Sequence, residues 1–231
     1  MESERLEYKF GLSLPDALML KARLAPFTEA DPHAQNGGYR IRSLYFDTPD
    51  GDAFREKNDG TDERVKYRLR YYNGDTSFFH LEKKEKRGNV SRKTGTTVDR
   101  ITAAMLAAGE YDTLRESGDP FLLEFYAAAH ISHLMPAVTV EYDRAPMLYR
   151  FDNVRLTVDT NVRAGRVTDF LQKRAVPFPV MEPGTALLEV KTDDRIPVFL
   201  NRLLEDVPRQ PQSYSKYALC YALIYSRADT D

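Results

Sequence analysis

The sequence predicts an α+β protein in which antiparallel β-strands dominate and helices are inserted between them. Several segments alternate charged and apolar residues with a period of two, as strands with one apolar face do. The dipeptide Asn73-Gly74 separates two β-prone runs, which is a strong signal for a hairpin. Helical patterns, two of which begin at a proline, occupy intervals between the strands.

The first half of the chain is expected to contain strands, two short helices and the hairpin. A proline after Ser13 favours a helix start, and Pro26 favours its end. The expected elements are a strand over 4–12, a helix over 17–24, a strand over 39–47, a short helix over 52–58, hairpin strands over 66–72 and 78–86, and a continuation over 90–93.

The second half is expected to begin with two helices, the first capped by Thr102, and to end with two more. Ser213 or Ser215 is the expected cap of the last helix. The expected elements are helices over 102–108 and 119–134, strands over 137–144, 154–159 and 186–191, and helices over 198–206 and 214–227.

The size and charge of the chain restrict its function. At 231 residues it is long enough to bury a substantial core. It contains no recognisable linker, repeat or low-complexity tract, so we expect residues 1–231 to form a single domain. The formal net charge is −2, whereas a nonspecific nucleic-acid binder usually has a basic excess, so no nucleic-acid partner is expected.

The apolar runs of the chain predict a cytoplasmic protein. Residues 1–5 contain no apolar signal region, and no stretch approaches the roughly 18 apolar residues of a membrane span. Direct membrane insertion is therefore not expected, and a membrane partner is left open. The single cysteine, Cys220, lies in an apolar run and is expected to be a buried structural thiol.

The hairpin carries a block of positive charge on one face. Residues two apart in a strand share a face, so Lys66, Arg68 and Arg70 point together. Between residues 64 and 93 there are ten Lys or Arg side chains and three acidic ones. Such a block is either a solvated outer face or a site for an anion. The positive charge of the chain is concentrated on these strands, which favours the anion site.

Other strands repeat this chemistry, with long cations and a few carboxylates on their charged faces. If the strands closed into a barrel, these side chains would line its lumen and helices would cover the apolar exterior. A lumen of Lys and Arg suits a chain of phosphates, because each phosphate oxygen accepts charge-assisted hydrogen bonds. Inward carboxylates would hold a divalent cation such as Mg²⁺ or Mn²⁺, which prefer oxygen ligands.

Eight motifs, in order, resemble the triphosphate tunnel metalloenzymes (the CYTH-like superfamily), and specifically the VTC-type polyphosphate polymerase domain. The resemblance covers nearly the whole chain. The motifs are Glu7-Tyr8-Lys9, Ser43-Leu44-Tyr45-Phe46-Asp47-Thr48, Lys66-Tyr67-Arg68-Leu69-Arg70-Tyr71-Tyr72, Leu81-Glu82-Lys83-Lys84 with Ser91-Arg92-Lys93, Tyr142-Asp143-Arg144, Arg155-Leu156-Thr157-Val158-Asp159, Leu188-Glu189-Val190-Lys191 and Tyr214-Ser215-Lys216-Tyr217.

The resemblance implies an antiparallel tunnel with a charged lumen and helices packed outside. It also implies which residues act there, by their positions in the motifs. The expected phosphate ligands are Lys9, Arg68, Arg70, Lys84, Arg92, Arg144, Ser215 and Lys216, of which Lys9, Arg68, Arg70 and Lys84 are the expected catalytic residues, and Glu189 is the expected metal ligand.

Two positions depart from the family pattern. Arg92 lies where the family usually has a lysine, and either Arg92 or Lys93 could contact phosphate. The hydrolytic members begin with a Glu-x-Glu-x-Lys strand, whereas this chain has Arg5-x-Glu7-x-Lys9. A cation in place of a potential metal ligand disfavours a hydrolase of that subgroup.

The implied function is a phosphotransferase that moves the terminal phosphoryl group of ATP to a growing polyphosphate chain, with Mn²⁺ or Mg²⁺. Positioning and charge stabilisation dominate such reactions. One alternative is a triphosphatase that hydrolyses inorganic triphosphate or a nucleotide, and another is a non-catalytic polyphosphate-binding module. A merely salt-bridged structural sheet does not explain the ordered motifs.

Overall fold

The computed structural model describes residues 5–34, 36–61, 63–88, 90–205, 207 and 214–228, with the side chains of 57 and 58 excepted. Its strands are β1 (Leu6–Ser13), β2 (Thr28–Ala30), β3 (Tyr39–Asp47), β4 (Glu63–Tyr72), β5 (Phe79–Arg87), β6 (Val90–Val98), β7 (Met135–Tyr149), β8 (Arg155–Gly165), β9 (Phe178–Pro179) and β10 (Thr185–Thr192). The helices are α1 (Leu14–Leu24), α2 (Asp52–Asn58), α3 (Arg100–Ala108), α4 (Pro120–Ile131), α5 (Val198–Leu203) and α6 (Lys216–Ala228).

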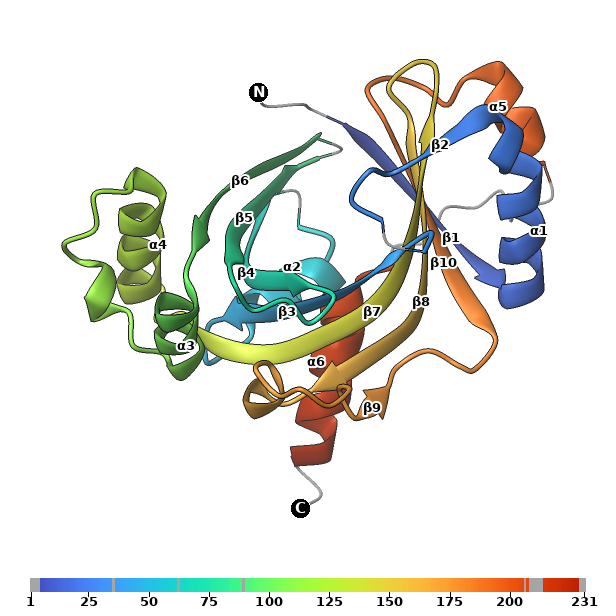
Figure 1. Ribbon diagram of the computed structural model, residues 1–231. Helices are drawn as coiled ribbons and strands as arrows, with labels where there is room; N and C mark the ends of the chain where they lie inside the picture. Colours follow the sequence, from blue (N-terminus) through green and yellow to red (C-terminus); the bar gives the residue numbers. More distant parts are fainter. Residues whose placement is uncertain are drawn as a thin grey trace.

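The ten strands form one antiparallel sheet, as the sequence predicted. The sheet path is β1-β10-β8-β7-β3-β4-β5-β6, with β2 paired to β7 and β9 to β8. Figure 1 shows that the sheet is strongly curved, so that β4, β5 and β6 face β1 and β10 across a central space. No ladder joins β1 to β6 in the described part of the chain. We call the inner, concave face of the sheet the lumen face.

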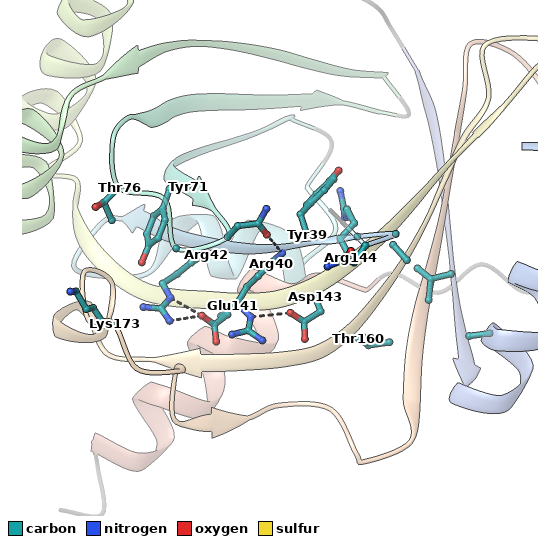
Figure 2. Close-up of a pocket in the computed structure, with 18 of the residues that line it drawn as sticks. Tyr39, Arg40, Arg42, Tyr71, Thr76, Glu141, Asp143, Arg144, Thr160 and Lys173 are labelled. Atoms are coloured by element: carbon teal, nitrogen blue, oxygen red, sulfur yellow. Dashed lines mark hydrogen bonds and ion pairs between the residues drawn. The ribbon is translucent and has the colours of Figure 1, made fainter. Parts of the chain in front are cut away.

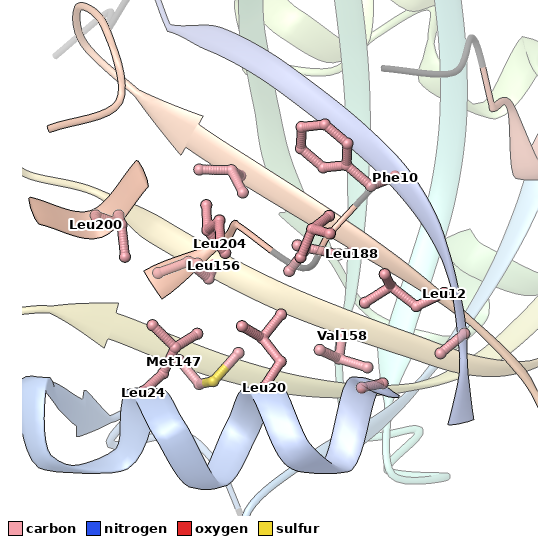
Figure 3. Close-up of a cluster of buried hydrophobic side chains, with 14 of the residues drawn as sticks. Phe10, Leu12, Leu20, Leu24, Met147, Leu156, Val158, Leu188, Leu200 and Leu204 are labelled. Atoms are coloured by element: carbon pink, nitrogen blue, oxygen red, sulfur yellow. The ribbon is translucent and has the colours of Figure 1, made fainter. Parts of the chain in front are cut away.

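Two apolar clusters cover the outer face of the sheet. In the first, α1 and α5 pack on β1, β8 and β10; Figure 3 shows Leu20 and Leu24 of α1 against Leu156 and Leu188 of the sheet. In the second, α3 and α4 pack on β3, β4 and β5 around Phe125, whose side chain is fully buried. These outer layers use the apolar alternate positions of each strand, which leaves the charged positions facing inward.

Helix α6 is different, because it lies against the lumen face. Its residues Tyr217, Cys220 and Tyr221 pack with Val138 and Val140 of β7. Cys220 is buried, as predicted for a structural thiol. The expectation that helices pack outside therefore holds for α1, α3, α4 and α5, but not for α6 or for α2, which packs in the same cluster as α6.

The predicted hairpin is confirmed, and its turn has the expected backbone. Asn73 and Gly74 have φ of 52° and 75°, and the Asp75 N–H donates to the Tyr72 carbonyl. Positive φ at both residues is what the Asn-Gly dipeptide provides. Strands β4 and β5 pair from Glu63↔Arg87 to Arg70↔His80.

Several predicted boundaries and caps differ from the structure. Asp99, not Thr102, caps α3, because its carboxylate accepts from the Thr102 N–H. β8 extends to Gly165, beyond the predicted end at 159, because the ladder continues after an irregularity where Asn161 has positive φ. β7 is also longer than predicted at both ends, β2 and β9 were not predicted, and helices α4 and α5 are shorter than expected.

The start of the last helix agrees with one of two predicted caps. The Ser215 hydroxyl accepts from the Ala218 N–H at 3.3 Å and so caps α6. The other predicted cap, Ser213, and the predicted end of the preceding helix at Asp206 lie outside the described residues. Over the described ranges, no helix combines the length and apolarity that a membrane crossing requires.

Candidate functional site

One carboxylate, Glu82 of β5, holds three cations on the lumen face. Arg68 Nε donates to it at 2.9 Å, Arg70 Nη2 at 2.7 Å and Lys93 Nζ at 2.9 Å. Burial alone would raise the pKa of Glu82, but Arg68, Arg70 and Lys93 outweigh it and lower that pKa to about 2. Glu82 is therefore ionised at neutral pH, and the cluster keeps an excess of positive charge.

Some polar side-chain atoms on the lumen face are buried without a hydrogen-bond partner in the described part of the chain. Arg70 Nε and Arg155 Nε make no hydrogen bond within the described residues, nor do the hydroxyls of Ser43 and Thr157. A buried donor without a partner is costly, by about 1–3 kcal/mol. Both guanidinium groups belong to side chains on the lumen face, where a bound anion would offset their positive charge.

A second cluster joins opposite walls of the curved sheet. Lys84 of β5 lies 2.9 Å from Glu7 of β1, and Lys191 of β10 lies 3.2 Å from Glu7 and 3.6 Å from Glu189. Lys9 contacts the same two carboxylates at 3.7 Å and 3.9 Å. Partial desolvation and the ammonium groups of Lys191 and Lys9 lower the pKa of Lys84 to about 8, although its side chain is 39% exposed and Glu7 opposes the shift.

A third cluster ties α6 to the lumen. Arg144 of β7 makes two bonds to Asp159, at 2.6 Å and 2.7 Å, and one to Glu189 at 3.0 Å. Lys216, the first residue of α6, lies 2.5 Å from Asp159. Burial by itself would lower the pKa of Lys216, but Asp159 and Glu189 raise it, so this lysine is charged.

Asp47 fixes the position of α6. Its carboxylate accepts from the N–H groups of Thr48, Ala53 and Phe54 at 2.8, 2.9 and 3.2 Å, and from the Tyr217 hydroxyl. Burial and the neighbouring Asp47 carboxylate raise the pKa of Tyr217, so its hydroxyl stays protonated and remains a donor. This network holds the start of α6, and with it Lys216, inside the curve of the sheet.

The structure brings most of the predicted site residues together on the lumen face. Lys9, Arg68, Arg70, Lys84, Arg144, Lys216 and Glu189 all belong to the three clusters. Ser215 lies beside them, and its hydroxyl serves as the cap of α6.

Arg92 is the exception, because it lies on the other face of β6. Directly opposite residues in an antiparallel pair share a face, and Arg92 is opposite Glu85 whereas Lys93 is opposite Lys84. Lys93 therefore takes the lumen position that the prediction gave to Arg92. The register of the β5–β6 hairpin decides between these neighbours, and the motif alone does not.

Sequence reasoning counted Lys191 and Arg155 among the cations that would line a lumen, but not among the expected phosphate ligands. Lys191 pairs in register with both Glu7 and Arg155, so these residues lie in one row across β1, β10 and β8. Arg155 also donates to Asp31 at 2.7 Å and to the Tyr39 hydroxyl at 2.8 Å. The available signal was the period-two pattern, which placed both cations on charged strand faces.

Glu7 and Glu189 provide a partial ligand set for a divalent cation. Two lysines contact both carboxylates, so the carboxylates are close enough to share one cation. Burial opposes ionisation of Glu189, but Lys191, Lys9 and Arg144 keep its pKa well below the usual range. The described residues contain no group of three or more His, Cys, Asp or Glu suited to a metal. A hard cation bound here would complete its shell with phosphate or water oxygens, as Mg²⁺ commonly does.

A cavity of about 790 Å³ lies on the outer face, and Arg144 of the third cluster is among the residues that line it. Figure 2 shows its wall, where Arg40 pairs with Asp143 and Arg42 pairs with Glu141, while Tyr39 and Arg144 point to the other side of the sheet. The Arg42 guanidinium donates hydrogen bonds to Glu141 and to backbone carbonyls of the segment 169–174. Arg40 and Arg42 are therefore paired with carboxylates of the protein itself, which leaves little of their charge available to a ligand.

Two solved structures share this fold at low sequence identity. A candidate adenylate cyclase from Bacillus halodurans aligns with a TM-score of 0.56 and 14% identity, covering 91% of this chain and 96% of its own. A candidate adenylyl cyclase from Hippeastrum, described as having a dominant triphosphatase activity, aligns with a TM-score of 0.55 and 17% identity over 95% of each chain. These likenesses support the α+β tunnel-like fold. No curated protein sequence matches the chain.

The family of this chain is assigned from a family model that matches nearly its whole length. The model of the VTC domain matches residues 4–225, which include all three lumen clusters and every motif in which the resemblance was found. The chain therefore belongs to the VTC domain family.

Proposed function

We propose that this protein transfers the terminal phosphoryl group of ATP to the end of a polyphosphate chain held in the lumen, and that a divalent cation assists. The observation that supports this most is the cluster at Glu82. Three cations share one carboxylate there, and the Nε of one of them, Arg70, has no hydrogen-bond partner among the residues that the structure describes. A row of phosphates supplies the missing negative charge and acceptors.

In phosphoryl transfer, the protein positions the phosphates and neutralises their charge. A bond forms between the γ-phosphorus of ATP and a terminal oxygen of the polyphosphate, and the bond to the β,γ-bridging oxygen breaks, so ADP leaves. In this proposal Arg68 and Arg70 orient the triphosphate, and Lys9 and Lys84 neutralise charge on the transferred group. The acceptor oxygen is already ionised, so no strong general base is needed.

Glu189 and Glu7 are the proposed metal ligands, with Mn²⁺ or Mg²⁺ as the cation. These carboxylates would hold the cation, which would supply positive charge next to the phosphates. The protein's own contribution is to keep both carboxylates ionised, through Lys9, Lys191 and Arg144, and to aim them into the lumen.

Hydrolysis is the second candidate, because the same cations serve either acceptor. The Hippeastrum protein of similar fold is described as having a dominant triphosphatase activity, which supports this alternative. Against it, the residue two positions before Glu7 is Arg5, which pairs with Asp193 at 3.0 Å and adds no oxygen ligand. The difference between the two reactions is whether water or phosphate reaches the in-line position.

Product analysis separates these candidates. The purified protein is incubated with ATP and Mn²⁺, with Mg²⁺ in parallel, and gel separation is combined with assays of ADP and free phosphate. We expect a ladder of polyphosphate, ADP and little free phosphate. Free phosphate without a ladder, also from inorganic triphosphate, indicates a triphosphatase, and tight polyphosphate binding with no turnover indicates a binding module.

Arginine variants test whether the lumen carries the reaction. Arg68→Ala and Arg70→Ala should each lower turnover by about 10²-fold or more, in the range seen when one transition-state donor is removed. Both should keep a cooperative unfolding transition, because the two side chains contact the lumen and not the outer apolar clusters. Loss of folding in both variants would contradict the tunnel interpretation.

A further inference from the structure

Four aromatic side chains line one end of the lumen beside Arg70. Tyr72 of β4 lies 5.4 Å from Tyr39 of β3 and 6.0 Å from His80 of β5, and Phe78 lies 5.4 Å from His80, measured between ring centroids. All three contacts are edge-to-face. The accessible ring surface of this wall is that of Phe78, which a flat ligand can stack on.

The aromatic wall continues directly from the phosphate-binding cations. Arg70 and Tyr72 are two residues apart on β4, and His80 is opposite Arg70 in the β4–β5 ladder, so all three share the lumen face. The Arg70 guanidinium lies 4.9 Å from the centre of the Tyr72 ring. Along β4, the lumen positions therefore run from cations at Lys66, Arg68 and Arg70 to an aromatic at Tyr72.

Phe78 is the exposed member of this wall. It is 47% exposed, although a phenyl ring is normally buried on folding. Its neighbour His80 is neutral at neutral pH, because burial and Arg70 lower its pKa. An uncharged aromatic surface beside a guanidinium is what proteins use to stack nucleobases next to phosphates.

We propose that the Tyr72, His80 and Phe78 wall binds the nucleobase of the nucleotide substrate, with the triphosphate running inward past Arg70. This inference rests on the proposed function, and it adds that the protein distinguishes a nucleoside triphosphate from inorganic triphosphate. Stacking accepts any base, because every base has a π face, so the wall selects nucleotides and not adenine in particular.

The chain contains no tryptophan, which gives a direct test. Phe78→Trp introduces a single fluorophore at the wall, and Phe151→Trp introduces one at an exposed phenylalanine that is 62% exposed and packs on Tyr149 in the outer layer. Each variant is titrated, in chelator so that no turnover occurs, with ATP and with inorganic tripolyphosphate. We expect ATP to quench the Phe78→Trp variant and not the Phe151→Trp variant, and tripolyphosphate to quench neither.

Affinity gives the second readout. Phe78→Ala should weaken ATP binding by about tenfold and leave tripolyphosphate binding within twofold of wild type, because base stacking is worth roughly 1–3 kcal/mol. Equal weakening of both ligands, or no change in either, overturns the inference while leaving the proposed function in place. Failure of the wild-type protein to bind either ligand overturns the proposed function and the inference together.

Discussion

Lys84 of β5 and Glu7 of β1 form an ion pair of 2.9 Å across the lumen, although five strands separate β5 from β1 along the sheet. The two walls of the tunnel therefore meet through side chains and not through a backbone ladder. The Lys84 side chain is 39% exposed and that of Glu7 is 15% exposed, so solvent weakens their attraction. A bound phosphate can compete with Glu7 for this lysine at little cost to the fold.

Two adjacent lysines test this relationship, because they lie on opposite faces of β5. Lys84→Met should weaken tripolyphosphate binding by about tenfold, as loss of one charge-assisted contact does, and change the unfolding free energy by less than about 1 kcal/mol. Lys83→Met is the matched control, since Lys83 pairs with Glu124 of α4 on the outer face. The tripolyphosphate affinity of Lys83→Met should equal that of wild type. Equal losses of affinity in both variants would show that the position of the charge on β5 does not matter.

A second matched pair concerns β6. Lys93→Ala should lower polyphosphate affinity several-fold, because Lys93 joins Arg68 and Arg70 at Glu82. Arg92→Ala should have no such effect, because its register position opposite Glu85 is on the outer face. Binding is measured at fixed ionic strength, since salt screens such contacts. If Arg92→Ala lost more polyphosphate affinity than Lys93→Ala, the assignment of Lys93 to the lumen would be wrong.

The pKa of Glu82 predicts a specific acid sensitivity. Folding lowers this pKa from 4.5 to about 2. Between these two pH values, Glu82 is protonated in the unfolded chain but ionised in the folded protein. The stability that the ionised carboxylate contributes is fully present above pH 4.5 and is lost as the pH falls toward 2, by roughly 3 kcal/mol in total. Urea unfolding at several pH values measures this.

The comparison with Glu82→Gln isolates this group from other acids. The wild-type protein should be the more stable at pH 6, and the difference in unfolding free energy should narrow as the pH falls below 4.5. A difference that stays constant down to pH 3 contradicts the assignment of Glu82 as the ionised centre of the cluster. Inorganic tripolyphosphate should stabilise Glu82→Gln more than wild type, because three cations then lack their carboxylate.

The Tyr217–Asp47 hydrogen bond predicts a defined loss of stability. Tyr217→Phe removes one donor from a buried carboxylate that keeps three backbone donors, so the unfolding free energy should fall by about 1–2 kcal/mol. Tyr126→Phe, on the half-buried face of α4, should change it by less than about 0.5 kcal/mol. If both variants unfold like wild type, Asp47 does not anchor α6.

The strands and their inward faces were predictable because a period of two is a local property of the sequence. It placed Lys9, Arg68, Arg70 and Lys84 on charged faces, and the structure gathers these faces in one lumen. The Asn73-Gly74 turn was equally local, since only residues that tolerate positive φ fit it.

What could not be predicted depends on distant contacts. Helix α6 is apolar on much of its surface, and nothing in its own residues shows that it packs on the lumen face and not outside. The choice between Arg92 and Lys93 depends on the register of the β5–β6 hairpin, which the family motifs do not specify. The Lys84–Glu7 pair depends on the curvature of the whole sheet, which no local pattern reports.

A crystal structure with inorganic tripolyphosphate tests the central claim most directly, because it locates the anion. We expect its phosphates in the lumen, with oxygens about 3 Å from Arg70, Lys84 and Arg144. Phosphates bound instead in the outer cavity beside Arg40, with the lumen still closed by its own ion pairs, would contradict the account.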